Sequence, residues 1–272
     1  MAHKTMVGGT AYEISGGKAL VDGTAYGIKG GKTLVDGTAY EIGFGKAVGD
    51  LEVGSSVYMN VQGVATEFLV VHQGLPNATL YDNSCDGTWL LQKETCSWTW
   101  SWNDNGVNAY ANSTIHQNLN QYYLGYIDAG VRSIIKQVKI PYCEGNGITT
   151  VHSGADGLST KVFLLGGREI GWTIGSTADT GRYTITDGAK LDYFIEGYGT
   201  AALAARTAYY EGSAKAWWLR SVLTNGGTTK ACMVNSDCSL SSVTVTNYSV
   251  KFRPAFILPP ETLVDSNFNI IA

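Results

Sequence analysis

The sequence has few charged residues, few prolines and no long hydrophobic run. Charged residues make up 15% of the 272 residues, and the net charge is −4. A nucleic-acid-binding surface needs concentrated Lys and Arg, so this composition argues against a nucleic-acid partner. No stretch approaches the roughly 20 apolar residues of a membrane-spanning helix, and residues 1–9 lack the apolar core of a signal peptide. We therefore expect no membrane insertion, and synthesis in a reducing cytoplasm.

Metal-binding patterns are also lacking. The five cysteines form no C-x-x-C pair, so the spacing of a zinc site is absent. Four loop residues could offer oxygen ligands to calcium, but they follow no ordered D-x-D-x-D pattern; they are Asp82, Asp86, Asp104 and Asn105. We expect no metal and no cofactor. The predicted free, buried thiols are Cys85, Cys96, Cys143, Cys232 and Cys238.

What the sequence has in abundance is glycine and aromatic residues. There are 34 glycines, 16 tyrosines and 7 tryptophans, with only five prolines. A hydrophobic content of 44% is enough to bury a substantial core. This composition excludes a disordered Pro/Gly-rich linker and favours a protein rich in β-structure.

The first 50 residues repeat a pattern with a period of 14 residues. The segment at 9–14 recurs at 23–28 and 37–42. Tyr12 and Ile14 fall on one face of a strand, and the Gly-Gly and Asp-Gly pairs between copies favour hairpin turns. Isolated hairpins are marginal in water, so we predict that these wind around copies from neighbouring subunits, in a homotrimer. Folding onto the rest of the chain and a solvated leader are the alternatives.

From residue 51 onward, the pattern indicates a mixed domain. Apolar runs predict strands over 57–61, 67–72, 88–91, 138–140, 161–165, 217–221, 231–234, 242–246 and 251–258. Helical spacing predicts one helix with a buried face at Ile115, Leu119, Tyr122 and Tyr123, and a second at Ile127, Val131, Ile134 and Ile135. A third is expected over 201–210. Early helices followed by late strands predict an α+β domain over residues 51–272, after a β-repeat module over 1–50.

Four motifs occur in order in this domain. They are Asn112-Ser113-Thr114-Ile115 through Leu119-Asn120, Val162-Phe163-Leu164-Leu165, Trp217-Trp218-Leu219-Arg220-Ser221 and Phe252-Arg253-Pro254-Ala255-Phe256. The series resembles a domain of unknown function common in Firmicutes and their phages, with a WWLRS…VRPAF signature, over about residues 55–258. Val222 replaces the family's usual proline, and Phe252 a more usual valine.

The resemblance implies a C-type lectin-like fold, similar to the variable proteins of diversity-generating retroelements and to formylglycine-generating enzymes. The 14-residue repeats resemble those of phage tail proteins. Together they imply a non-enzymatic receptor-binding protein in the virion tail of a phage or phage-like particle. Its partners would be a bacterial surface receptor, glycan or protein, and other tail proteins. The alternative is an enzyme on the same scaffold, either glycan-cleaving or a Cys-dependent oxidase.

In that fold, the C-terminal loops would form the binding face. They are rich in the polar side chains that make adaptable hydrogen bonds in antibody loops, although ordinary polar hairpin loops would look the same. The predicted ligand-binding residues are Leu223, Thr224, Asn225, Thr228, Thr229, Lys230, Asn235, Ser236, Asp237, Thr244, Thr246 and Tyr248.

Other candidate residues favour structural roles. Trp98, Trp100 and Trp102 alternate, so on a strand they would form a core stripe or a sugar-stacking face. Arg220 and Arg253 lie within apolar motifs, where they are expected to tie loops to carboxylates or carbonyls. The position of His116 next to Ile115 predicts that it lies off the buried helix face. No G-x-S-x-G elbow supports a serine hydrolase.

Overall fold

The computed structural model describes residues 45–173, 185–223 and 227–272 in full, and within residues 1–44 the backbone of six strands. These are β1 (His3–Val7), β2 (Thr10–Ser15), β3 (Lys18–Val21), β4 (Thr24–Gly27), β5 (Gly31–Val35) and β6 (Thr38–Ile42). Sequential strands pair antiparallel, β1 to β4 in one sheet and β5 with β6 in another. The expected shared face of Tyr12 and Ile14 concerns side chains outside the described set.

The core of the large domain is a four-stranded sheet in the order β20-β10-β9-β8. Its strands are β8 (Ser56–Val61), β9 (Val64–Gln73), β10 (Thr88–Gln92) and β20 (Ala255–Leu258). Every residue of β10 and β20 is buried, as expected for a strand made of an uninterrupted apolar run. Three of these strands match the sequence prediction. The fourth begins later than predicted, directly after Pro254, which has no N–H to donate to a neighbouring strand.

A second sheet, in the order β17-β18-β19, carries the C-terminal loops. Its strands are β17 (Trp217–Val222), β18 (Lys230–Val234) and β19 (Leu240–Thr244). All six residues of β17 are buried. β19 begins two residues earlier than predicted because a tight turn sets its register. Asn235 N donates to Ser239 O at 2.8 Å, and Cys238 adopts a positive φ of 67°.

Short helices cover the core and lie near where the sequence places them. They are η3 (Tyr110–Asn112), α1 (Thr114–Asn118), the π-helical turn η4 (Leu119–Tyr123), α2 (Leu124–Tyr126), α3 (Ala129–Ile134) and α4 (Thr200–Arg206). Ser113 caps α1, its hydroxyl accepting from the backbone N–H of His116. Tyr122 is exposed although its predicted helical neighbours are buried, because the π-turn shifts the helical phase.

Small two-stranded sheets and two 3₁₀ turns complete the domain. They are β11 (Val138–Ile140) with β14 (Leu158–Thr160), β12 (Tyr142–Gly145) with β13 (Ile148–His152), β15 (Tyr209–Tyr210) with β16 (Ser213–Ala214), η1 (Val48–Asp50) and η2 (Asn83–Cys85). The predicted strand at 161–165 is instead an extended segment with one bridge, at Phe163. The backbone N–H groups of Lys161 and Val162 donate to the side chain of Asn120 rather than to a strand.

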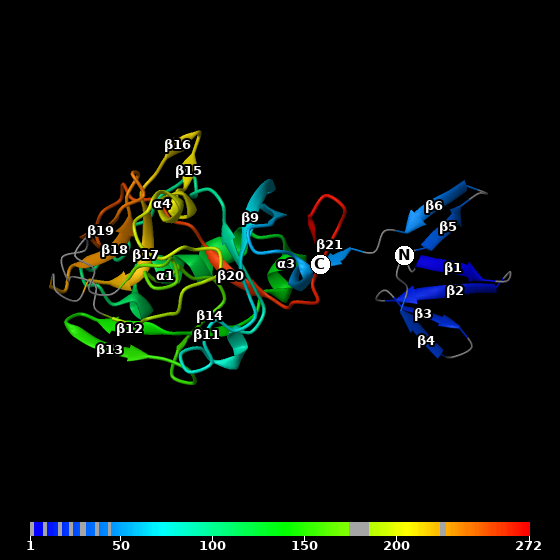
Figure 1. The fold of residues 1–272 in the computed structure, drawn as a ribbon, viewed down its shortest axis with the longest axis horizontal. Helices are drawn as coiled ribbons and strands as arrows, with labels where there is room; N and C mark the ends of the chain where they lie inside the picture. Colours follow the sequence, from blue (N-terminus) through cyan, green and yellow to red (C-terminus); the bar gives the residue numbers. More distant parts are fainter. Residues whose placement is uncertain are drawn as a thin grey trace.

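The large domain begins earlier in the chain than predicted. β7 (Lys46–Ala47) pairs with β21 (Leu263–Val264), which pairs with β22 (Ile270–Ile271). Val48 is fully buried, and its N–H donates to Thr262 O at 2.7 Å. Residues 46–50 therefore pack with the large domain rather than with the repeats. Figure 1 shows this small sheet at the end of the domain facing β1–β6, and β17–β19 toward the opposite end.

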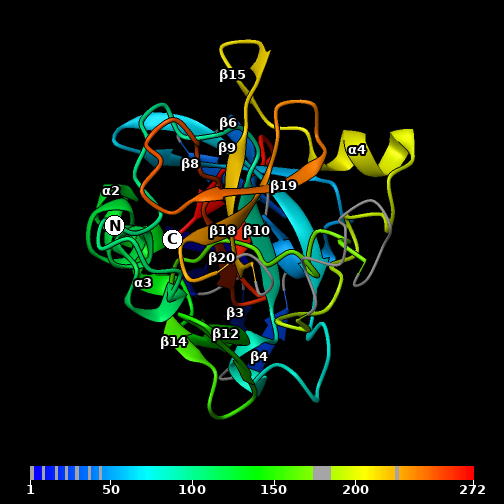
Figure 2. The same cartoon turned by 90° about the vertical axis from the view of Figure 1, so that its left-hand side faces the viewer.

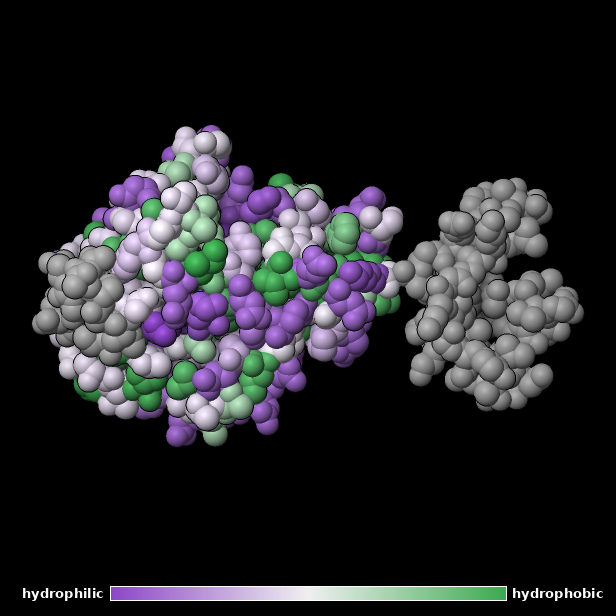
Figure 3. Space-filling view, in the orientation of Figure 1, coloured by the Kyte–Doolittle hydropathy of each residue, from purple (hydrophilic) through white to green (hydrophobic). Residues whose placement is uncertain are grey.

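The large domain is thus an α+β unit of antiparallel sheets and short helices. On the face drawn in Figure 3, small hydrophobic areas alternate with hydrophilic ones. None of the helices in the described ranges is both long enough and apolar enough to cross a membrane.

Candidate functional site

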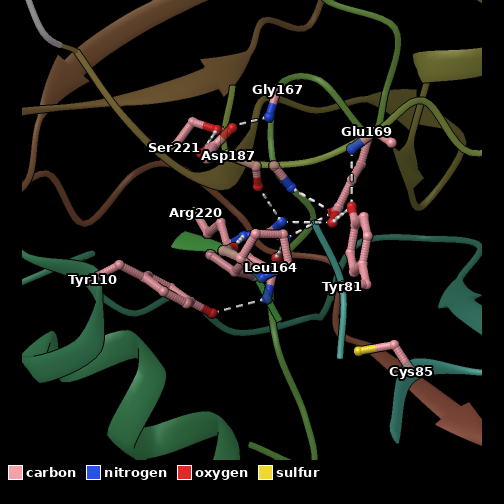
Figure 4. Close-up of polar contacts among 12 residues, drawn as sticks. Tyr81, Cys85, Tyr110, Leu164, Gly167, Glu169, Asp187, Arg220 and Ser221 are labelled. Carbon is pink, nitrogen blue, oxygen red and sulfur yellow. Dashed lines mark hydrogen bonds and ion pairs between the residues drawn. The ribbon is translucent and has the colours of Figure 1, made fainter. Parts of the chain in front are cut away.

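Arg220 of β17 forms the centre of a buried polar network (Figure 4). Its guanidinium group donates to both carboxylate oxygens of Glu169, at 2.5 and 2.7 Å. It also donates to three backbone carbonyls, of Pro141, Leu164 and Asp187, at 2.8–2.9 Å. The side chains of Arg220 and Glu169 are completely inaccessible to solvent. The prediction that Arg220 ties loops to a carboxylate and to carbonyls is confirmed.

Further hydrogen bonds extend this network. The hydroxyl of Tyr81 donates to Glu169 at 2.7 Å, and burial raises the pKa of Tyr81, which keeps its proton on the phenol. Ser221 donates to Asp187 at 2.6 Å and accepts from the backbone of Gly167 at 2.7 Å. The network therefore attaches the segments around 164–169 and 187 to β17. Its acidic members gave no sequence signal, because nothing in the local pattern marks a buried carboxylate.

Arg253 and Arg206 hold further loops. Arg253 donates through Nε to Gln92 O at 2.9 Å and lies over the Trp217 ring at 4.8 Å. Burial lowers the pKa of Arg253 to about 10. Arg206, which the sequence analysis did not single out, donates to the carbonyls of Ile170, Gly171, Ile195 and Gly197. The arginine side chains are thus structural supports for the strands and loops behind the C-terminal sheet.

The structure splits the predicted binding residues between the two ends of the sheet. Because β18 is antiparallel to both neighbours, the turn at 235–239 lies at one end, and residues 223, 227–230 and 244–248 lie at the other. Leu223 is buried and cannot form part of an exposed face, which corrects that prediction. Thr224 and Asn225 are outside the described residues. The exposed members are Thr229, Ser236, Asp237, Thr244, Thr246 and Tyr248, and the half-buried ones are Thr228, Lys230 and Asn235.

The loop at 103–108 was not predicted to belong to the site, but it contacts the group formed by residues 227–230 and 244–249. Val245 N donates to Thr229 O at 2.9 Å, and Asn108 donates through its backbone and side chain to Thr228 O and Lys230 O. Asp104 accepts from Ser101 and from the Tyr248 hydroxyl, and these hydrogen bonds lower its pKa. We call residues 103–108, 227–230 and 244–249 the loop face. Figure 2 looks toward this end of the molecule.

The loop face has a close-packed base. Gly145, at the end of β12, has a φ of 79°, and an added Cβ there would lie 1.9 Å from Asn108 O. Only glycine permits that approach. The side chain of Asn108 is almost fully buried and also accepts from Asn146 N at 2.8 Å. The exposed side chains are therefore supported by a fixed backbone.

The three alternating tryptophans do not form a strand face. Trp102 is buried and donates through Nε1 to Leu219 O at 2.8 Å. Trp100 stacks on Phe252 with ring centres 4.6 Å apart, and Trp98 meets the same ring edge-on at 5.9 Å. These indoles help to form the core, and Trp98 also lines a cavity.

Two surface cavities, each of about 440 Å³, lie outside the predicted site. One, the Tyr58–Tyr210 groove, is lined by residues that include Tyr58, Thr66, Glu67, Glu94, Trp98 and Tyr210. The other lies beside β12 and β13, where His152 Nε2 is 3.3 Å from Glu144 Oε2 and the His152 ring stacks on Tyr142. The residues of either groove come from distant parts of the chain, so sequence spacing could not group them.

The prediction for His116 was wrong. His116 is buried against the Tyr110 ring, 5.1 Å between centres, rather than lying off the buried face. Burial lowers its pKa to about 4. None of the five cysteines is in a disulfide and all are buried, as predicted. Within the described ranges, no group of three or more His, Cys, Asp or Glu side chains is placed to hold a metal ion.

Comparison with known proteins gives one match. No curated protein and no solved structure matches the sequence. A family model described as a domain of unknown function, DUF6273, matches residues 86–260, which is more than half of the chain. That range includes β10, Arg220 and Glu169 of the buried polar network, the loop face and β20. The chain therefore belongs to the DUF6273 family.

Proposed function

We propose that this protein is a receptor-binding, adhesin-like protein at the tail tip of a phage or phage-like particle, and that the loop face binds a molecule on the bacterial surface. The observation that carries this proposal is a set of exposed polar side chains on a rigid base. Thr229, Thr244, Thr246 and Tyr248 are exposed, whereas Val245 and Asn108, which hydrogen-bond to the backbone at 228–229, are buried. Such a base allows the exposed residues to vary without disturbing the fold.

The chemistry of the loop face suits recognition. Tyrosine offers a large, rigid contact surface, and threonine hydroxyls offer hydrogen bonds at low entropic cost. The Tyr248 ring is 60% exposed, and its hydroxyl donates to Asp104. This hydrogen bond orients the ring before any ligand arrives, so less rotational freedom is lost on binding.

The proposal includes a C-type lectin-like fold for the large domain and a β-hairpin repeat module that assembles a homotrimer or attaches it to other tail proteins. The chain enters the large domain at β7, at the end away from β17–β19 (Figure 1). Subunits joined through their repeats would present several loop faces in one direction. Linked sites raise avidity by roughly 10²–10⁴ without any new contact.

An enzyme on this scaffold is the second candidate. A glycan-cleaving site needs two carboxyl groups in one cleft, and Glu67 and Glu94 both line the Tyr58–Tyr210 groove. Hydrogen bonds from Ser56 and Lys93 outweigh burial and lower the pKa of Glu67, which suits a base but not a proton donor. For a Cys-dependent oxidase, Cys232 and Cys238 are the candidates; both are buried, and neither forms a disulfide.

The test is binding of the fluorescently labelled full-length protein to a panel of Firmicutes cells. The variant Thr229→Ala/Thr246→Ala/Tyr248→Ala removes exposed side chains of the loop face and is expected to weaken binding at least tenfold. Tyr209→Ala is the matched control, because Tyr209 is 46% exposed but lies on the β15–β16 hairpin. Equal binding by the triple variant and the parent would rule out the loop face as the receptor site.

A further inference from the structure

The Tyr58–Tyr210 groove is a second surface feature, separate from the loop face. It lies where the β8–β9 hairpin, the segment 92–98 and β15 meet, and it shares no residue with the loop face. Its volume of about 440 Å³ falls within the range of roughly 300–1,000 Å³ that is typical of small-ligand sites. The groove therefore has room for a small molecule.

The lining combines aromatic rings with hydrogen-bonding groups. Tyr58, Trp98 and Tyr210 are half-buried, so part of each ring remains accessible. Glu67, Glu94 and Thr66 also line the groove, and the Thr66 hydroxyl already donates to Val64 O at 3.0 Å. A purely apolar ligand would strip water from these polar groups without replacing their hydrogen bonds. The lining instead suits a ligand with apolar faces and polar edges.

Charged groups of both signs surround the groove. Glu67 accepts from Lys93 at 2.9 Å. Lys251 donates to the backbone carbonyl of Ser97 in the groove wall and lies 4.6 Å from the centre of the Tyr210 ring. Glu211 also hydrogen-bonds to the Tyr210 side chain, so three carboxylates face two ammonium groups. The remaining negative charge disfavours an anionic ligand.

The indole N–H group of Trp98 has no hydrogen-bond partner among the described residues. Nε1 of Trp98 is buried and has no hydrogen-bond partner in the described structure. Buried indole N–H groups are usually paired. Because this nitrogen is closed to solvent, the part of Trp98 that lines the groove is its ring rather than its N–H group.

From these observations, we propose that the Tyr58–Tyr210 groove binds a short, uncharged saccharide of two or three sugar units. A sugar ring has an apolar face that can lie on Tyr210 or Trp98, and hydroxyl edges that can donate to Glu67 and Glu94. Hydrogen bonds to ionised carboxylates are stronger than those between neutral groups. The inference does not rest on the loop face, because it concerns different residues and a different ligand surface.

Titration calorimetry on the full-length protein tests this proposal, with lactose, maltotriose, cellotriose and triacetylchitotriose as neutral probes. At least one probe is expected to bind. Tyr210→Ala and Glu94→Gln are each expected to weaken that binding about tenfold, whereas Tyr209→Ala, which changes the neighbouring exposed ring, leaves it intact. Sialyllactose, which adds a negative charge to lactose, is expected to bind no more tightly than lactose.

Two outcomes overturn the proposal: no heat of binding with any neutral probe, or binding that survives both groove substitutions. Glu94 is exposed, so Glu94→Gln remains a valid test if Tyr210→Ala fails to fold. Tyr248→Ala separates this site from the proposed receptor site. A groove that works independently keeps its saccharide affinity in that variant, even when binding to cells is lost.

Discussion

Replacing Arg220 with alanine is the most direct test of the buried framework. In the parent protein, the Glu169 carboxylate is fully buried and receives two hydrogen bonds from this guanidinium group. Arg220→Ala leaves that charge without its counter-ion, and three backbone carbonyls lose a donor. Breaking a buried ion pair in this way costs about 3–5 kcal/mol. For a domain of this size, each kcal/mol lowers Tm by about 2–4 °C, so we expect a drop of roughly 6–20 °C.

Urea and thermal unfolding, followed by near-UV circular dichroism, measure this loss. The double variant Arg220→Met/Glu169→Gln removes both charges and is expected to be more stable than Arg220→Ala, although the carbonyl bonds are still missing. A free energy of unfolding for Arg220→Ala within about 1 kcal/mol of the parent would refute the reasoning. A double variant no more stable than the single one would show that the charge is not the main cost.

Three further predictions concern pH, thiol reactivity and the repeats. Burial holds the pKa of His116 near 4 in the folded protein against about 6.5 unfolded, so the unfolded state binds the extra proton as pH falls from 6.5 to 4. Between pH 6.5 and 4, the free energy of unfolding of the parent should therefore fall by up to about 3 kcal/mol more than that of His116→Gln. Chemical denaturation that gives the same pH dependence of this free energy for both proteins would contradict the prediction. Burial also raises the pKa of Cys85 to about 12 and of Cys143 to about 11. Fewer than one thiol per chain should therefore react with a disulfide reagent at pH 8 until the protein is unfolded. Rapid labelling of the native protein would disprove this prediction. Deleting residues 1–44 should give a folded protein that is a monomer by light scattering and binds cells much more weakly. Deleting residues 1–50 should also destabilise the large domain, because Val48 is lost. An unchanged oligomer after the first deletion would exclude the repeats as the assembly module.

Local patterns in the sequence were enough to find the strands of the two main sheets, β8–β9–β10–β20 and β17–β18–β19. The apolar run at 88–91 forms a buried strand, as predicted. Pro141 ends the strand at 138–140, also as predicted. Predictions failed where a side chain far away in the sequence competes for the backbone. Asn120 takes the N–H groups of Lys161 and Val162, and the predicted strand there does not form.

The same reason limits prediction of the candidate site. Helical spacing placed His116 off the core, but the ring of Tyr110 covers it. Predicted helix 201–210 ends at Arg206, because Tyr209 and Tyr210 pair with Ser213 and Ala214 instead. The two groups of polar loop residues looked continuous in the sequence, yet the antiparallel register of β18 and β19 sends them to opposite ends of the sheet.

The short sheet of β7, β21 and β22 also has a mechanical consequence. Tension applied along the chain from residues 1–44 enters the large domain at β7, which is held to β21 by only two residue pairs. Peeling off Lys46 and Ala47 uncovers little apolar surface, since neither side chain is fully buried. The first anchor that resists strongly is Val48, which is completely buried. A pull on the leading segment should therefore lengthen the connection by a few residues, reversibly, before it strains the strands that support the loop face.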